Sequence, residues 1–145
     1  MELSEQIKPQ EIQSNIAIDC AKLMEDQVSK KTGITGLAFK AVYGALKGVS
    51  PNYIKEAIER LLPQVSVALD PIWKEGLATG DPFQYLVENN STTADVILSV
   101  TDAKIEKSQN KIVKIAYKKV RHSVKGEVAE AIPGLTQILG NYIKF

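Results

Sequence analysis

Residues that carry much of protein chemistry are scarce in this chain of 145 residues. It has one cysteine, Cys20, and one histidine, His122. A single cysteine excludes a disulfide within the chain and fits a reducing compartment. Sites built on two histidines are excluded, and one cysteine so far from one histidine disfavours a zinc site. We therefore expect neither a metal nor another cofactor.

Long hydrophobic runs are also missing. The longest weakly polar run, 33–48, is interrupted by Lys40 and Lys47, whereas a membrane-spanning helix needs about 20 mostly apolar residues. The first thirteen residues, MELSEQIKPQEIQ, are polar and lack the apolar core of a secretion signal. These features predict a cytoplasmic protein without a transmembrane segment.

Catalytic and nucleotide-binding motifs are absent as well. The chain contains no GxxxxGK[ST], GxGxxG, GxSxG or HExxH. The short Gly33-Ile-Thr-Gly36 has no strand before it and does not resemble a phosphate loop. The sequence therefore offers no catalytic residue, and we expect a non-enzymatic protein.

What is present is helical periodicity. Hydrophobic residues make up 44% of the chain, and they recur at steps of three and four, as in amphipathic helices. Pro9 suits the first turn of one helix, and Thr32-Gly33 ends it. The next helix, 34–49, is apolar and rich in glycine and alanine. Because an interior glycine costs about 1 kcal/mol relative to alanine, this helix is expected to pack closely on a neighbour.

Proline and glycine divide the rest of the chain. Four of the six prolines lie between residues 50 and 83 and predict short helices there. Asp70-Pro71 and Asp81-Pro82 each predict a helix start, with the aspartate as cap and the proline in the first turn. Longer helices are expected over 93–107 and 109–125, followed by two short pieces separated by Pro133-Gly134. Strand signals are weak. The prediction is an all-α protein, with residues 1–145 forming a single compact domain of eight or nine helices.

Two parts of the chain resemble each other. Residues 39–47 align with 113–121, which pairs Tyr43 with Tyr117, and 58–66 align with 128–136, which pairs Pro63 with Pro133. Any two amphipathic helices align their apolar positions, so coincidence explains the match equally well. If the repeat is real, it covers about 23–70 and 97–143 and predicts two helical units related by a pseudo-twofold axis.

A family resemblance rests on five segments. They are KKTGITGLAFKAVYGALK, IERLLP, VTDAKIEKS, YKKVR and AEAIPGL. Together they resemble a small bacterial family of short helical proteins without an assigned function. The resemblance implies an all-α fold and supplies no site residues.

Positive charge is concentrated in one segment. Residues 104–125 carry a net charge of +7, although the whole chain carries only +1. Helical spacing places five basic residues on one side, which makes them candidates for binding an anion: Lys111, Lys114, Lys118, Arg121 and Lys125. The alternative is a solvated face that pairs with the acidic N-terminal half. With only two arginines in the chain, nucleic acid is the least favoured anionic partner.

Other candidate groups have simple structural explanations. Cys20 lies on an apolar stripe and is expected in the core rather than paired with His122 as a nucleophile, and His122 is expected on the surface. The carboxylate pairs Glu127–Glu130 and Asp102–Glu106 lie among basic residues and are expected to form ion pairs along their helices. Three aromatic residues could line a pocket between helices: Tyr43, Trp73 and Tyr117.

Three functions follow from these features. The favoured one is a helical scaffold or interaction module that binds itself or another protein. The second is a binder of a phospholipid surface, nucleic acid or acidic protein through the helix at 109–125. The third is a carrier of a small apolar ligand between helices.

Overall fold

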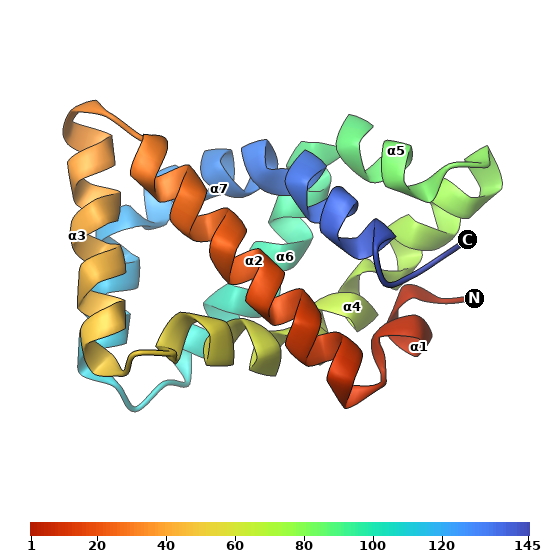
Figure 1. Cartoon of the computed structure of the whole chain (residues 1–145). Helices are drawn as coiled ribbons and strands as arrows, with labels where there is room; N and C mark the ends of the chain where they lie inside the picture. The colour runs from red at the N-terminus through yellow and green to blue at the C-terminus, as the bar shows by residue number, and fades with distance from the viewer.

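Seven helices account for nearly all of the chain in a computed structural model that describes residues 1–145. They are α1 (Leu3–Ile7), α2 (Gln10–Lys30), α3 (Gly33–Val49), α4 (Tyr53–Thr79), α5 (Pro82–Glu88), α6 (Asn90–Glu106) and α7 (Lys111–Gly140) (Figure 1). There is no strand, and the helices form a single domain. The prediction of an all-α fold is confirmed. None of the helices has the length and apolarity that crossing a membrane requires.

The prediction of eight or nine helices was wrong because three prolines lie inside helices. Pro63 and Pro71 are within α4, and Pro133 is within α7. All three face solvent, where water can bind the carbonyl that a proline leaves without a donor. α4 also buries seven residues along its length, and this burial holds the helix together across both prolines.

Other helix ends follow the local sequence. The carboxylate of Asp81 accepts a hydrogen bond from the Gln84 backbone N–H at 3.1 Å, which caps α5 as expected from Asp81-Pro82. Asp70 was expected to cap a helix of its own in the same way. It lies inside α4 instead, and its carboxylate accepts from the backbone N–H (2.9 Å) and hydroxyl (2.5 Å) of Ser4. Asp70 therefore caps α1, a helix that the sequence did not predict.

The largest hydrophobic cluster extends from the middle of the molecule to the end where the two termini meet (Figure 1). Trp73 of α4 is fully buried there, with its ring edge-to-face on Phe83 at 5.3 Å between centroids. Its indole N–H donates to the carbonyl of Met1 at 3.1 Å, so the one polar atom of the ring has a partner. α1, α2, α4, α5 and α7 all contribute side chains to this core.

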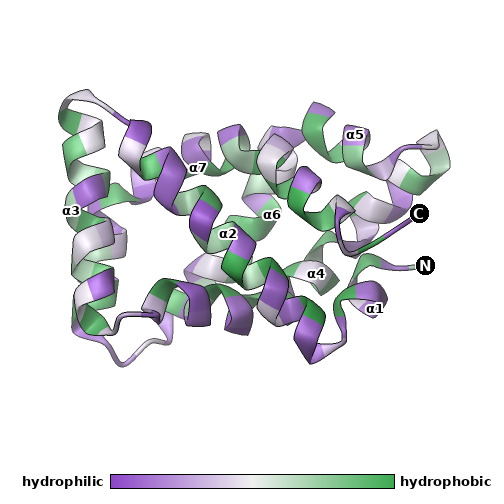
Figure 2. Ribbon diagram, viewed as in Figure 1, coloured by the Kyte–Doolittle hydropathy of each residue, from purple (hydrophilic) through white to green (hydrophobic).

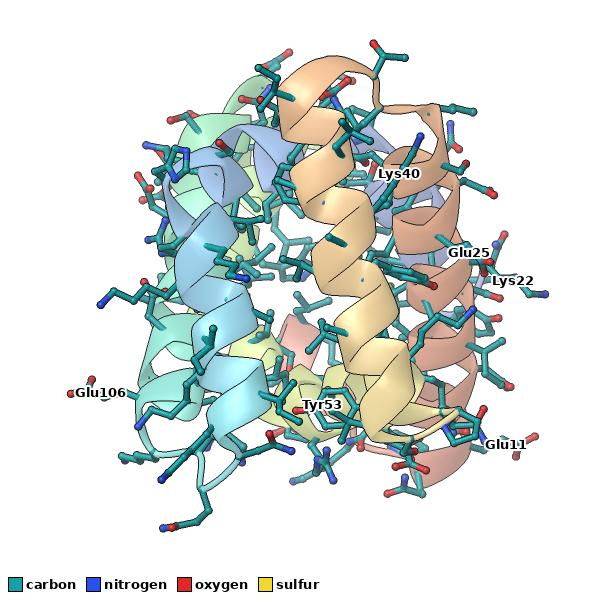
Figure 3. The ribbon with its side chains drawn as sticks, turned by 90° about the vertical axis from the view of Figure 1, so that its left-hand side faces the viewer. Glu11, Lys22, Glu25, Lys40, Tyr53 and Glu106 are labelled. Atoms are coloured by element: carbon teal, nitrogen blue, oxygen red, sulfur yellow. The ribbon has the colours of Figure 1, made fainter.

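α3 lies at the opposite end of the molecule and packs against α2, α4 and α7 (Figure 1). It runs beside the first half of α7, and the two helices point in opposite directions (Figure 3). α7 changes direction about midway along its length (Figures 1 and 3), in the part of the helix that contains Gly126. Glycine is one of the usual causes of such a bend.

The two parts of the chain that resemble each other in sequence share a local hydrogen bond but differ in how their helices are connected. The hydroxyl of Ser66 donates to the carbonyl of Pro63 (2.9 Å), and that of Thr136 donates to the carbonyl of Pro133 (2.8 Å). However, the turn at 50–52 separates α3 from α4, whereas α7 is one bent helix across the aligned region. The pair of separate helices expected after Ser108 is not present. A duplication with a pseudo-twofold axis stays a prediction.

Candidate interaction surface

α3 is the most apolar of the longer helices, yet only Gly36 in it is buried. Its inner side contributes partly buried residues such as Phe39, Tyr43 and Leu46. The outer side is open, with Ile34 89% and Leu37 69% exposed. We call this outer side the α3 face, and it consists of Ile34, Leu37, Ala38, Ala41, Gly44, Ala45 and Gly48.

The glycines of the α3 face have no neighbour to accommodate. A methyl group added at Gly44 or Gly48 would meet nothing within 4 Å. Gly36 is different, because such a methyl group would lie 2.7 Å from the backbone of Lys31. The close packing expected from the small residues of this helix therefore occurs only at Gly36. At Gly44 and Gly48 the prediction was wrong, because that side of the helix faces solvent.

Apolar exposure continues from α3 onto α7. Ile112 and Ile115 are 56% and 59% exposed, whereas Val113, Ala116 and Val120 face the interior. These two isoleucines lie in the first turns of α7, in the half of that helix that runs beside α3. Figure 2 shows green, apolar segments along α3. Exposed apolar residues on two adjacent helices make an extended patch of a kind that marks interaction sites.

No acidic residue lies in α3 or in the first half of α7. The chain contains none between Gly33 and Lys55, and none between Lys111 and Gly126. In Figure 3, which looks onto this end of the molecule, the labelled acids Glu11 and Glu106 lie at the edges of the view, and Glu25 lies on α2, the helix beside α3. A shallow hollow at the start of α3 is likewise lined by apolar, neutral and basic residues only: Lys31, Thr32, Gly33, Ile34, Leu37 and Lys40.

The five basic candidates on α7 differ in their surroundings. The Arg121 guanidinium bonds both oxygens of the Asp102 carboxylate, at 2.8 and 2.9 Å, and Lys125 lies 3.0 Å from Asp95. Lys114 donates to the carbonyl of Glu106 at 3.2 Å. Lys111 and Lys118 are exposed and form no ion pair. The acids that pair with this stripe belong to α6, not to the N-terminal half as the sequence suggested.

Arg121 and Asp102 form a cluster with Tyr117. The tyrosine hydroxyl donates to Asp102 at 2.5 Å. The hydrogen-bonded Arg121 guanidinium lowers the pKa of the Asp102 carboxyl, against a smaller opposing effect of burial. Burial and the neighbouring carboxylate raise the pKa of the Tyr117 hydroxyl. The cluster joins α6 to α7, and Asp102 occupies the Nε–Nη2 edge of Arg121 and pairs with its charge.

The three aromatic pocket candidates occupy different places. Trp73 is enclosed in the core, and Tyr117 belongs to the cluster with Asp102. Tyr43 lies on α3 with the Lys47 ammonium 5.5 Å from its ring centroid. A second shallow hollow lies between α2 and α4, lined by Gln10, Gln13, Glu56, Glu59, Arg60 and Pro63. None of the three aromatic residues lines either hollow.

The remaining candidate groups have structural rather than catalytic surroundings. Cys20 packs against the core, and its burial raises the pKa of its thiol to about 12, opposite to the shift that a thiolate nucleophile requires. His122 is exposed on α7. Glu127 and Glu130 both bind Lys31, at 3.0 and 2.8 Å. These two carboxylates therefore pair with a lysine at the end of α2, not with one along their own helix.

Sequence reasoning missed the α3 face as an exposed surface. The glycines and alanines of this helix predict contacts within the chain, whereas those of the α3 face are exposed. The stretches without acids in α3 and in the first half of α7 were the available signal. A helix side that only faces solvent usually carries charges of both signs, so a side without acids indicates a surface that binds a partner.

Comparison with known proteins places the chain in a family without supplying a function. A family of unknown function, DUF6918, matches residues 3–143. No curated protein and no solved structure matches the chain. The chain therefore belongs to DUF6918, a family of unknown function.

Proposed function

We propose that this protein is a non-enzymatic interaction module that binds a protein or a lipid surface through the α3 face, together with Ile112 and Ile115. The observation that carries the proposal is the exposure of Ile34 and Leu37 on the most apolar of the longer helices. A side chain of this size gains about 1.5–3 kcal/mol from full burial. In the isolated chain these two residues gain little of it.

The glycines of α3 support the same function. Each glycine inside a helix costs about 1 kcal/mol relative to alanine. Gly44 and Gly48 could both be alanine without any contact in this chain. Glycine at these two positions is therefore not required by any contact within the folded monomer. It would, however, let a partner approach the backbone of α3 closely.

The test is photo-crosslinking in the cells that make the protein. A photoreactive amino acid replaces Leu37 on the α3 face in one variant, and Val67 in the other. Val67 is an apolar control, 60% exposed on α4. We expect a crosslinked adduct with a protein or a lipid from position 37 and none from position 67. No adduct from position 37, or equal adducts from both, would contradict the proposal.

A further inference from the structure

We infer that the partner of the α3 face is the surface of an anionic phospholipid bilayer, on which the protein lies peripherally. This inference rests on the proposed function and names the partner. Three features carry it: the apolar centre of the surface, the basic residues on both of its sides, and the absence of acids across two adjacent helices.

The apolar centre and its basic borders have the pattern of an interfacial surface. Lys40 and Lys47 are seven residues apart on α3, and Figure 3 shows Lys40 on the side toward α2. On the other side, α7 exposes Lys111, Lys118 and Lys119, none of which forms an ion pair. Lysines around exposed aliphatic side chains can hold their ammonium groups at the level of lipid headgroups while the apolar residues enter the bilayer.

The extent of the acid-free surface favours a flat, extended partner. It covers the outer side of α3 and continues onto the first half of α7. A partner protein that docked through a single acidic helix would cover only a narrow strip of this surface. It would need basic residues only along that strip. A bilayer rich in anionic lipids presents negative charge to the whole surface at once.

Two other partners fit less well. A second copy of the chain, docked through the same surface, would bring lysines against lysines with no carboxylate between them, which is destabilising. Nucleic acid would leave Ile34 and Leu37 against phosphates. It would also meet no arginine without an acidic partner on this surface, because Arg121 pairs with Asp102 and Arg60 lies on α4.

The first experiment measures binding of the full chain to sedimented vesicles. One set contains phosphatidylcholine alone, and the other contains equal amounts of phosphatidylcholine and phosphatidylglycerol. We expect binding only to the second set, and we expect it to weaken as salt is added. Absence of binding, or equal binding to both sets, would overturn the inference.

The second experiment uses matched charge variants. Lys40→Gln with Lys119→Gln removes one charge from each side of the surface. Lys74→Gln with Lys104→Gln removes the same net charge from exposed positions on α4 and α6. Since each lysine near an anionic surface changes affinity about fivefold, the first pair is expected to weaken binding about 25-fold and the second pair less than about twofold. Equal losses would mean that only net charge matters, which contradicts a defined surface.

The third experiment reports insertion directly. Leu37→Trp places an indole on the α3 face, and Val67→Trp places one on α4. The native Trp73 is buried and supplies a constant background. We expect anionic vesicles to shift the emission of the Leu37→Trp variant to shorter wavelength and to leave the Val67→Trp variant unchanged. An unchanged Leu37→Trp spectrum would overturn insertion at this face.

The vesicle results and the crosslinking results separate the two proposals. A protein adduct from position 37 without vesicle binding would keep the interaction function and overturn the membrane inference. Neither adduct nor vesicle binding would overturn both.

Discussion

α3 and α4 are consecutive helices joined by a three-residue turn, and they make opposite use of their sequences. α3 is strongly apolar and buries only Gly36. α4 contains two prolines and several charged residues, yet it buries seven residues, including Trp73. Burial in this protein therefore follows where a helix lies rather than how apolar it is.

The positions of the two helices explain the contrast. α4 packs against α1, α2, α3, α5 and α6, so that neighbours surround much of its length. α3 lies at the end of the molecule and has neighbours on one side only (Figure 1). Stability is thus expected to come mainly from the end of the molecule that contains Trp73. The outer side of α3 is free to bind a partner.

The largest loss of stability is expected at Trp73, in the hydrophobic cluster to which α4 contributes. Trp73→Ala removes a fully buried ring and its hydrogen bond to Met1, and we expect it to lower the free energy of unfolding by about 3–5 kcal/mol. Urea denaturation followed by circular dichroism measures this change. Leu37→Ala on the α3 face is the control, with an expected change below about 0.5 kcal/mol. Similar losses of unfolding free energy in both variants would contradict the difference in burial between α3 and α4.

The second prediction compares one glycine from each helix. Gly76 of α4 is buried, and a methyl group there would lie 2.7 Å from the Cα atom of Pro82. Because backbone cannot move aside cheaply, Gly76→Ala should destabilise the fold by about 1–3 kcal/mol. Gly44→Ala meets no atom and should stabilise it by about 0.5–1 kcal/mol. Thermal unfolding of both variants checks the opposite signs, and a loss of stability in Gly44→Ala would show that its side of α3 is packed.

Local sequence rules predicted the helices well, because helix periodicity is a property of neighbouring residues. The cap at Asp81-Pro82, the end of α2 near Thr32-Gly33 and the core position of Cys20 all follow from short-range spacing. The number of helices could not be predicted from short-range spacing, because whether a proline interrupts a helix depends on tertiary contacts. Pro63 and Pro71 are tolerated since the opposite side of α4 is buried.

The candidate site was less predictable for the same reason. The sequence identified the basic residues of α7 but not their partners, because Asp95 and Asp102 lie in a different helix. It also could not indicate that the apolar stripe of α3 has an outer side without a neighbour. Which side of an all-round apolar helix meets solvent depends on the packing of the whole domain.

The third prediction concerns the contact that ties α7 to α6. The Arg121 guanidinium holds the pKa of Asp102 below its usual value, so the ion pair stabilises the folded state above the pKa of the unfolded carboxyl, near 4. This stabilisation is lost as the pH falls through the lower pKa of the folded state. Asp102→Asn should therefore cost up to about 1 kcal/mol near pH 7, because the pair is partly exposed.

Unfolding midpoints of the wild type and of Asp102→Asn, measured from pH 7 down to pH 2, check this. The difference between them should shrink on acidification. A difference that is constant over the whole range would mean that the carboxylate charge contributes nothing.

The smallest effect on stability is expected on the α3 face itself. Ile34→Ser with Leu37→Ser removes two aliphatic side chains that are already mostly in water, so the free energy of unfolding should change by less than about 0.5 kcal/mol. Binding to vesicles of phosphatidylcholine and phosphatidylglycerol should nevertheless fall at least tenfold, because the same side chains supply the apolar area that enters the bilayer. Val67→Ser on α4 should alter neither property. A large loss of stability in the double variant would mean that these residues belong to the core, and the contrast between α3 and α4 would then fail.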